Sequence, residues 1–172
     1  SAAGAQALRD AVGHGAGMGA GEVERMSEGS GIGRREFNDS DQHAVQFLQI
    51  WLHPEQRSIE PGDEQKEVSE ADKRDRLCLV ASRAGGGGAL KIHQDARIYT
   101  SLLTAGKGLR HDFAAGRIGW LQVASGRLRI GDQVLEAGDG AAIRDEKSLA
   151  ITAEQDSELL LFDIAGPAFR PR

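Results

Sequence analysis

The longest alternating pattern of apolar and polar residues lies between residues 117 and 143, in RIGWLQVASGRLRIGDQVLEAGDGAAI. Leu128 and Ile130 alternate there with arginines, so one row of side chains is expected to be buried and the other exposed to water. Gly131-Asp132 separates this run from the next one, and glycine at such a position tolerates the positive φ of a two-residue hairpin turn. A second turn is expected at residues 137–140. The pattern predicts a β-meander in the middle of a small barrel.

Other short apolar runs continue this pattern on both sides. Strands are expected at residues 77–82 and 158–165, and two more are expected within residues 91–103. Four consecutive glycines at 85–88 indicate a loop. Ser69 resembles a helix-start signal, so a helix of one or two turns is expected there. About eight to ten short strands with almost no helix predict an all-β fold, either a sandwich or a barrel.

The first third of the chain carries one strong apolar run, AVQFLQIWL at residues 44–52. Both of its faces are apolar, which predicts a strand that is covered on both sides and ends before Pro54. Shorter strands are expected near residues 23–26 and 31–37. The highly charged segment 55–76 is interpreted as an ordered linker between two lobes.

The composition and net charge of the chain argue against several classes of function. The net charge of −5 argues against a nucleic-acid binder that works by neutralising phosphates. No stretch approaches the 18 apolar residues of a membrane span, and the N-terminus does not read as a signal peptide. Cys78 is the single cysteine, which excludes an internal disulfide and suits a reducing compartment such as the cytoplasm. We interpret Cys78 as a small core residue.

The histidines share no metal-binding spacing. Each is expected to be a packed or surface residue, and they stand at His14, His43, His53, His93 and His111. An alternative is that His93 and His111 line a small-molecule pocket in the barrel of the second lobe together with Tyr99 and Gln122. No arrangement of a nucleophile with a base is visible, so no catalytic residue is assigned.

The turn pattern of the second lobe resembles the cupin barrel, a jelly roll with two motifs. The stretch Gly106 to Gly126 matches the first motif, but only His111 stands at a ligand-type position in it. By this resemblance, Phe113, Gly119 and Ala141 occupy the other places where cupins carry metal ligands. A divalent metal needs three or four converging N or O ligands, so this lobe is expected to be metal-free.

Longer stretches resemble bacterial members of the pirin family. The matching segments are SEGSGIGRREFN (27–38), LQIWLHPE (48–55), IEPGDEQKEVS (59–69), IHQDARIY (92–99) and EAGDGAAIRDE (136–146). The resemblance implies a two-lobed cupin and covers about residues 8–165. It implies a partial N-terminal cupin lobe at 1–54, a linker with a short helix at 55–76, a complete C-terminal cupin lobe at 77–165 and a tail at 166–172.

Pirins carry iron in the N-terminal lobe, held by three histidines and one glutamate, and several have quercetin 2,3-dioxygenase activity. The resemblance places the first two histidines upstream of residue 1 and the other ligands at residues 33–36, where this chain keeps only Glu36. Arg34 stands in place of the third histidine. A guanidinium has no lone pair to offer and repels a cation. Arg34 is therefore expected to pair with Glu36 at the former metal position.

These departures favour a pirin-like cupin that is metal-free and non-enzymatic, without a cofactor, and that binds a protein partner or a small aromatic ligand. The alternative is a metal-dependent dioxygenase of the quercetin 2,3-dioxygenase type, with iron or another divalent metal held by ligands supplied from elsewhere. A partial first lobe leaves the apolar segment 44–52 with an unpaired edge. A homo-oligomer is therefore expected, with no direct contact to nucleic acid or membrane.

Overall fold

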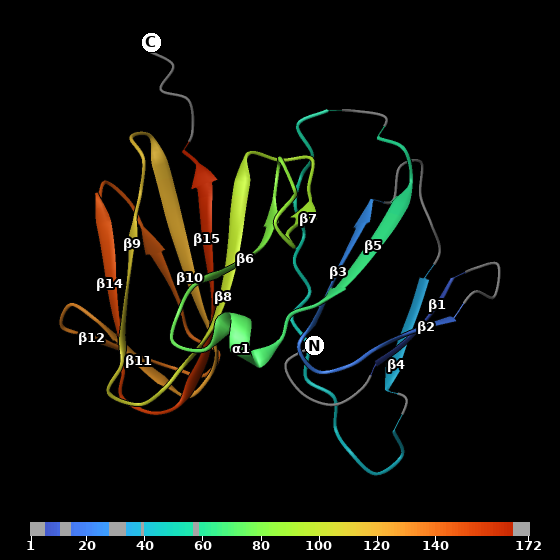
Figure 1. Cartoon of the computed structure of the whole chain (residues 1–172), viewed down its shortest axis with the longest axis horizontal. Helices are drawn as coiled ribbons and strands as arrows, with labels where there is room; N and C mark the ends of the chain where they lie inside the picture. The colour runs from blue at the N-terminus through green and yellow to red at the C-terminus, as the bar shows by residue number, and fades with distance from the viewer. Residues whose placement is uncertain (1–5, 11–14, 28–33, 39, 57–58, 167–172) are drawn as a thin grey trace.

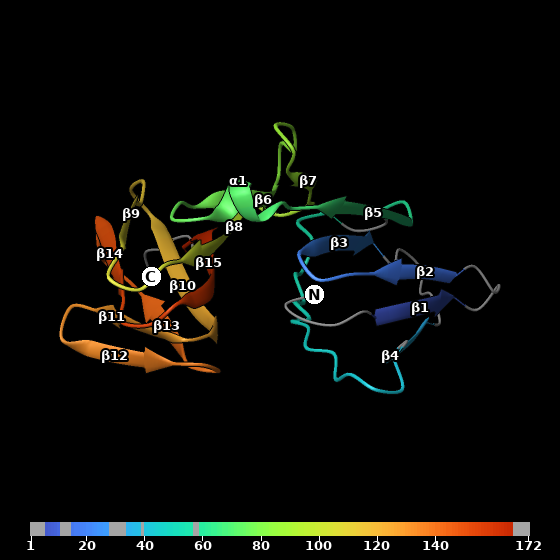
Figure 2. The ribbon, with the colours of Figure 1, turned by 60° about the horizontal axis from the view of Figure 1, so that its bottom comes forward.

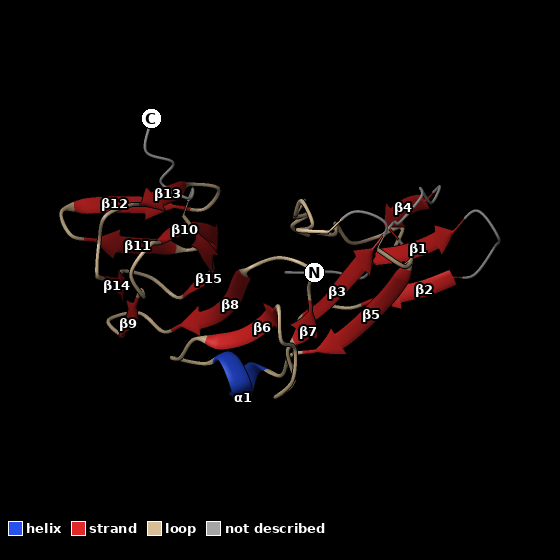
Figure 3. Cartoon of the chain, turned by 90° about the horizontal axis from the view of Figure 1, so that it is seen from above, coloured by secondary structure: helices blue, strands red, loops and turns tan. Residues whose placement is uncertain are grey.

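The computed structural model describes residues 6–10, 15–27, 34–38, 40–56 and 59–166. Figure 1 shows two lobes of strands with one short helix, α1 (Glu70–Lys73), below the gap between them, and Figure 3 shows how little of the fold is helical. The strands are β1 (Gln6–Asp10), β2 (Gly15–Met18), β3 (Glu22–Ser27), β4 (Arg34–Asn38), β5 (Gly62–Glu67), β6 (Cys78–Ser82), β7 (Leu90–Lys91), β8 (Ala96–Leu103), β9 (Gly108–Asp112), β10 (Arg117–Ser125), β11 (Arg127–Ile130), β12 (Gln133–Glu136), β13 (Gly140–Ile143), β14 (Ser148–Ala153) and β15 (Ser157–Ala165).

The second lobe is a barrel of two sheets. A six-stranded sheet has the order β13-β10-β15-β8-β6-β7, and a four-stranded sheet has the order β12-β11-β14-β9. Figure 2 shows the strands of both sheets enclosing one interior. Apolar residues of alternate positions fill that interior, among them Leu103, Leu121, Leu128, Ile151, Leu159 and Leu161. The predicted all-β cupin barrel is confirmed.

Local signals in the sequence are also confirmed. Ile130 pairs with Gln133 across the hairpin between β11 and β12, and Gly131 in the turn has a φ of +54°. Glycine takes this left-handed conformation without the Cβ clash of other residues. Ser69 caps helix α1, because its hydroxyl accepts a hydrogen bond from the Asp72 amide at 3.2 Å.

The first lobe consists of a three-stranded sheet, β2-β1-β4, and a two-stranded sheet, β3-β5. Strand β5 comes from the charged segment 55–76, whose composition predicts a linker. It pairs antiparallel with β3 from Glu22↔Glu67 to Ser27↔Gly62. Part of that segment is thus a structural strand of the first lobe, and its charge reflects the exposed alternate positions of a strand.

The prediction of a strand at residues 44–52 is wrong. Among the described residues, this segment forms no named strand and has only an isolated β-bridge at Gln46. Five large apolar side chains in it are at least one third exposed: Phe47, Leu48, Ile50, Trp51 and Leu52. A run that is apolar on both faces has the composition of a doubly covered strand, but composition does not supply a neighbouring strand to pair with. The expected homo-oligomer stays a prediction.

The two lobes meet on the outer face of the six-stranded sheet. A second apolar cluster there contains Val80, Leu90, Ile92 and Ile98, and Val23 and Val68 pack against it from the first-lobe side. Within the described ranges, no helix is long and apolar enough to cross a membrane.

Candidate functional site

The two positions that the resemblance assigns to a former metal site, 34 and 36, lie on β4. Arg34 and Glu36 belong to this strand, and β4 pairs with β1 so that Asp10 faces Arg34 and Leu8 faces Glu36. The two positions are two residues apart, so they belong to the same face of the strand. The side chains at 34–36 lie outside the described ones, so the expected pairing of Arg34 with Glu36 stays a prediction.

A metal site needs several ligands that converge on one point. Among the described residues, no three side chains of His, Cys, Asp or Glu come together. In the second lobe, the positions that correspond to cupin ligands are filled by packing. A Cβ on Gly119 would lie 2.5 Å from Cζ of Phe113, so the aromatic ring occupies the space beside this glycine.

The one ligand-type histidine of the second lobe has a protein partner instead. His111 Nε2 on β9 lies 2.9 Å from Oδ2 of Asp163 on β15, and Asp163 is 1% exposed. Arg117 on β10 donates to the same carboxylate through Nε and to the Asp163 carbonyl through Nη2 at 2.6 Å. Arg117 also donates to Asp95 at 2.8 Å. These four residues tie the two sheets of the barrel and the loop before β8 together.

The pKa values of Asp95, within this cluster, and of Tyr99, beside it, are shifted for different reasons. The hydrogen bond from Arg117 holds the pKa of Asp95 below its usual value. Burial raises the pKa of Tyr99, whose ring lies 5.1 Å from that of His111. A buried carboxylate with two cationic or hydrogen-bonding neighbours is a satisfied structural group, and the cluster leaves no ligand free for a metal.

The predicted pocket of His93, His111, Tyr99 and Gln122 does not form as one site. Tyr99 and His111 do meet inside the barrel. His93 instead lies in the cleft on the outer side of the six-stranded sheet. Gln122 fastens the turn before β13, donating to the carbonyls of Gly138 at 3.0 Å and Asp139 at 2.9 Å. Alternation points Tyr99 of β8 into the barrel and Gln122 of β10 out of it, and His93 lies between β7 and β8, outside any strand.

Asp163 and Arg117 were not identified from the sequence. Asp163 can be identified by its place in the run ELLLFDI, where it falls on the same face of the strand as two buried leucines. Leu159 and Leu161 precede it at buried positions of the same strand, so a carboxylate follows at a core position. A buried carboxylate requires a partner, which directs attention to a cation on a neighbouring strand.

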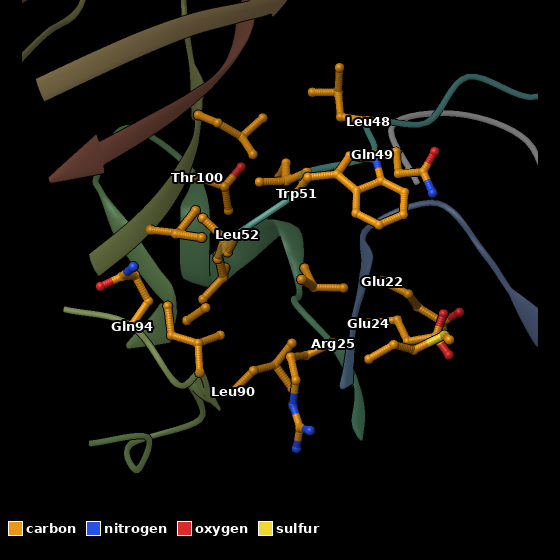
Figure 4. Close-up of a pocket in the computed structure, with 18 of the residues that line it drawn as sticks. Glu22, Glu24, Arg25, Leu48, Gln49, Trp51, Leu52, Leu90, Gln94 and Thr100 are labelled. Carbon is orange, nitrogen blue, oxygen red and sulfur yellow. The ribbon is translucent and has the colours of Figure 1, made fainter. Parts of the chain in front are cut away.

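A large cleft separates the lobes, with a volume of about 1260 Å³. Its walls are the outer face of the six-stranded sheet, strand β3 and the extended segment after residue 46. Figure 4 shows Leu52, Thr100 and Leu90 on one side of this space and Glu22, Glu24 and Arg25 on the other.

Cys78 belongs to neither apolar cluster, in contrast to its interpretation as a small core residue. It lies at the start of β6 and is partly buried. Burial raises the pKa of its thiol, which lowers the fraction of reactive thiolate.

Comparison with known proteins connects both lobes to one family. Residues 2–52 match the family described as "Pirin", and residues 79–164 match the family described as "Quercetinase C-terminal cupin domain". An Escherichia coli K12 protein named quercetin 2,3-dioxygenase is 36% identical over 156 residues, which is 91% of this chain and 66% of that protein. A pirin-like protein of Caulobacter vibrioides is 35% identical over 85% of this chain and 63% of its own length. The chain thus spans about two thirds of the length of these relatives.

Solved structures agree with this assignment. YhhW from Escherichia coli is 34% identical, with a TM-score of 0.88 over 98% of this chain and 70% of its own. A second structure of that bacterial pirin, 35% identical over 96% of this chain and 70% of its own, is a complex with nickel(II) and has a TM-score of 0.87. The nickel(II) complex contradicts the expectation that no cofactor is bound. That expectation rested on Arg34 and on the absence of further ligands. Both observations concern only a part of the metal site.

Proposed function

The chain belongs to the pirin family, and on this premise we propose that the protein is a metal-dependent oxidoreductase of the quercetin 2,3-dioxygenase type. The observation that carries the proposal is the 36% identity over 91% of the chain to the Escherichia coli enzyme of that name. The nickel(II) complex of a bacterial pirin with the same fold supports a divalent metal as its cofactor. The binding-only alternative has no comparable support.

The first lobe is the proposed location of the metal, with Glu36 on β4 as a ligand. A carboxylate is a suitable donor for iron or nickel, whereas Arg34 is not. The described residues do not complete a ligand set. The proposal therefore requires further ligands from residues outside the described ranges or from sequence that is not part of this chain. No catalytic step is assigned to the residues of the second lobe, because His111 and Asp163 are satisfied by each other and by Arg117.

The role of Glu36 is tested with Glu36→Gln, which keeps the size of the side chain and removes its charge. The metal content of the purified protein should fall at least tenfold, since losing one anionic ligand weakens a site strongly. Glu67→Gln is the matched control, because Glu67 is an exposed glutamate at the end of β5. Equal metal content in Glu36→Gln and the control would show that Glu36 is not a metal ligand.

A further inference from the structure

The two lobes are tied together by side chains as well as by the chain that connects them. The ammonium of Lys73 on α1 lies 3.0 Å from Oε1 of Glu158 on β15. Lys66 on β5 donates to the Ala89 carbonyl at 3.2 Å. Both of these ties belong to the connection itself, because β5 and α1 are the last elements before the barrel. A third tie fastens the crossing segment, residues 40–56, which lies between β4 and β5 in the chain.

This third tie, here called the latch, joins the end of the crossing segment to the loop before β8. The Glu55 amide donates to the His93 carbonyl at 2.8 Å. The Gln94 side chain donates to the His53 carbonyl at 2.6 Å. In the opposite direction, the Asp95 amide donates to the Glu55 carboxylate at 3.2 Å. The backbone of each segment thus acts as donor and as acceptor, which fixes how the two segments are aligned.

The barrel holds its own half of the latch firmly. Arg117 donates to the Asp95 carboxylate at 2.8 Å through Nη1 and to the Asp95 carbonyl at 3.4 Å through Nη2. The Ala165 amide donates to the same carbonyl at 3.1 Å. Arg117 is in turn paired with the buried carboxylate of Asp163. Breaking the latch should therefore release the crossing segment and leave the loop of the barrel in place.

The other half of the latch leads into the first lobe. Strands β4 and β5 belong to different sheets of that lobe. Close to β4, the Asn38 side chain donates to the His43 carbonyl at 2.6 Å and accepts from the Ser40 amide at 3.1 Å. Farther along, the Gln46 side chain donates to the Ala124 carbonyl of the barrel at 3.3 Å. The crossing segment is thus held along its course from β4 to the latch.

The latch is placed where it can open while the barrel stays folded. The carboxylate of Glu55 also pairs with Arg83, and these two side chains are 37% and 56% exposed. Water replaces the contacts of exposed groups when they separate, so each contact is weak. Local opening of this kind needs less free energy than unfolding of a packed core.

We propose that Gln94 and Glu55 form a latch by which the barrel fixes the position of strand β4, so that Gln94 is a positioning residue for the first lobe. The value of the latch for metal binding rests on the proposed function, because Glu36 on β4 is the ligand proposed there. The latch itself needs no metal, and its test uses the metal-free protein.

The experiment measures amide hydrogen exchange by NMR in Gln94→Met, which keeps the size of the side chain and removes its donor and its acceptor. The amide of Glu55 and the amides of β4 should exchange about fivefold faster than in the wild type, because the loss of a hydrogen bond favours the open state by about this factor. The amides of β10 and β15 should keep their wild-type rates, since Arg117 still holds the loop.

A second variant, Glu55→Met, breaks the latch from the side of the crossing segment and should produce the same pattern. In the double variant the increase in rate should be smaller than the product of the two single increases, because both changes open one contact. The matched control is Gln122→Met, since Gln122 is another glutamine of the second lobe and binds the carbonyls of Gly138 and Asp139. It should speed exchange next to β13 and leave position 55 and β4 unchanged.

Two results would overturn the proposal. Wild-type exchange at position 55 in both single variants would show that the latch does not hold the crossing segment. Faster exchange at position 55 with unchanged exchange in β4 would show a local contact that positions nothing in the first lobe. Neither result depends on metal content or turnover, so failure of the proposed function would be seen separately.

Discussion

The ring of Phe113 lies so close to Gly119 that a Cβ on the glycine would be 2.5 Å from Phe113 Cζ. Gly119→Ala should therefore destabilise the second lobe by about 1–3 kcal/mol, since the ring must move within a packed core. Chemical denaturation measures this difference. Gly62→Ala is the control, because a Cβ there meets nothing closer than 3.7 Å and should change stability by less than about 0.5 kcal/mol. Equal effects of the two changes would contradict this packing.

Asp163 is predicted to be the most sensitive polar position of the barrel. Asp163→Asn keeps the shape but leaves Arg117 buried without its main counter-charge, and breaking such a pair costs about 3–5 kcal/mol. The free energy of unfolding should fall by an amount in this range. Asp112→Asn removes an exposed pair with Arg110 and should cost less than about 1 kcal/mol. Similar losses in both variants would show that burial of Asp163 carries no energetic weight.

The pH dependence of stability should carry a contribution from Asp95. Its pKa is lowered in the folded chain by the hydrogen bond from Arg117, so the unfolded state binds the proton more readily. The stabilisation is present above the unfolded pKa of about 3.9 and is lost as the pH falls through the folded pKa. Asp95→Asn should reduce the loss of stability between about pH 4 and pH 2. An unchanged slope in the variant would exclude this contribution.

Much of the second lobe, and the short helix before it, could be predicted from the sequence, because their signals are local. The hairpin at Gly131 depends on residues that are adjacent in the chain, and the cap at Ser69 depends on a residue three positions away. The buried rows follow from alternation within each strand. Tyr99 and His111, two members of the alternative pocket, lie with their ring centroids 5.1 Å apart, whereas the pocket as a whole stays a prediction.

The remaining features depend on partners that the sequence does not name. The segment 44–52 is apolar enough for a strand, but in the described ranges it forms only an isolated bridge at Gln46, and it lines the cleft at the sheet face instead. Arg117 and Asp163 are 46 residues apart, and Lys73 and Glu158 are 85 apart. Pairs at such separations become visible only when the strands have been assembled. The expected absence of a metal rested on Arg34 and on two histidines placed upstream of residue 1, and the nickel(II) complex of a related pirin contradicts it.

The measurement that tests the proposed function most directly is the metal content of the protein, expressed from its own gene and purified without chelator, combined with oxygen-dependent cleavage of quercetin. The account predicts iron, nickel or a similar divalent metal close to one per chain, and turnover that is lost when the metal is removed and restored when it is returned. Protein that carries no metal, takes none up and leaves quercetin intact would contradict it.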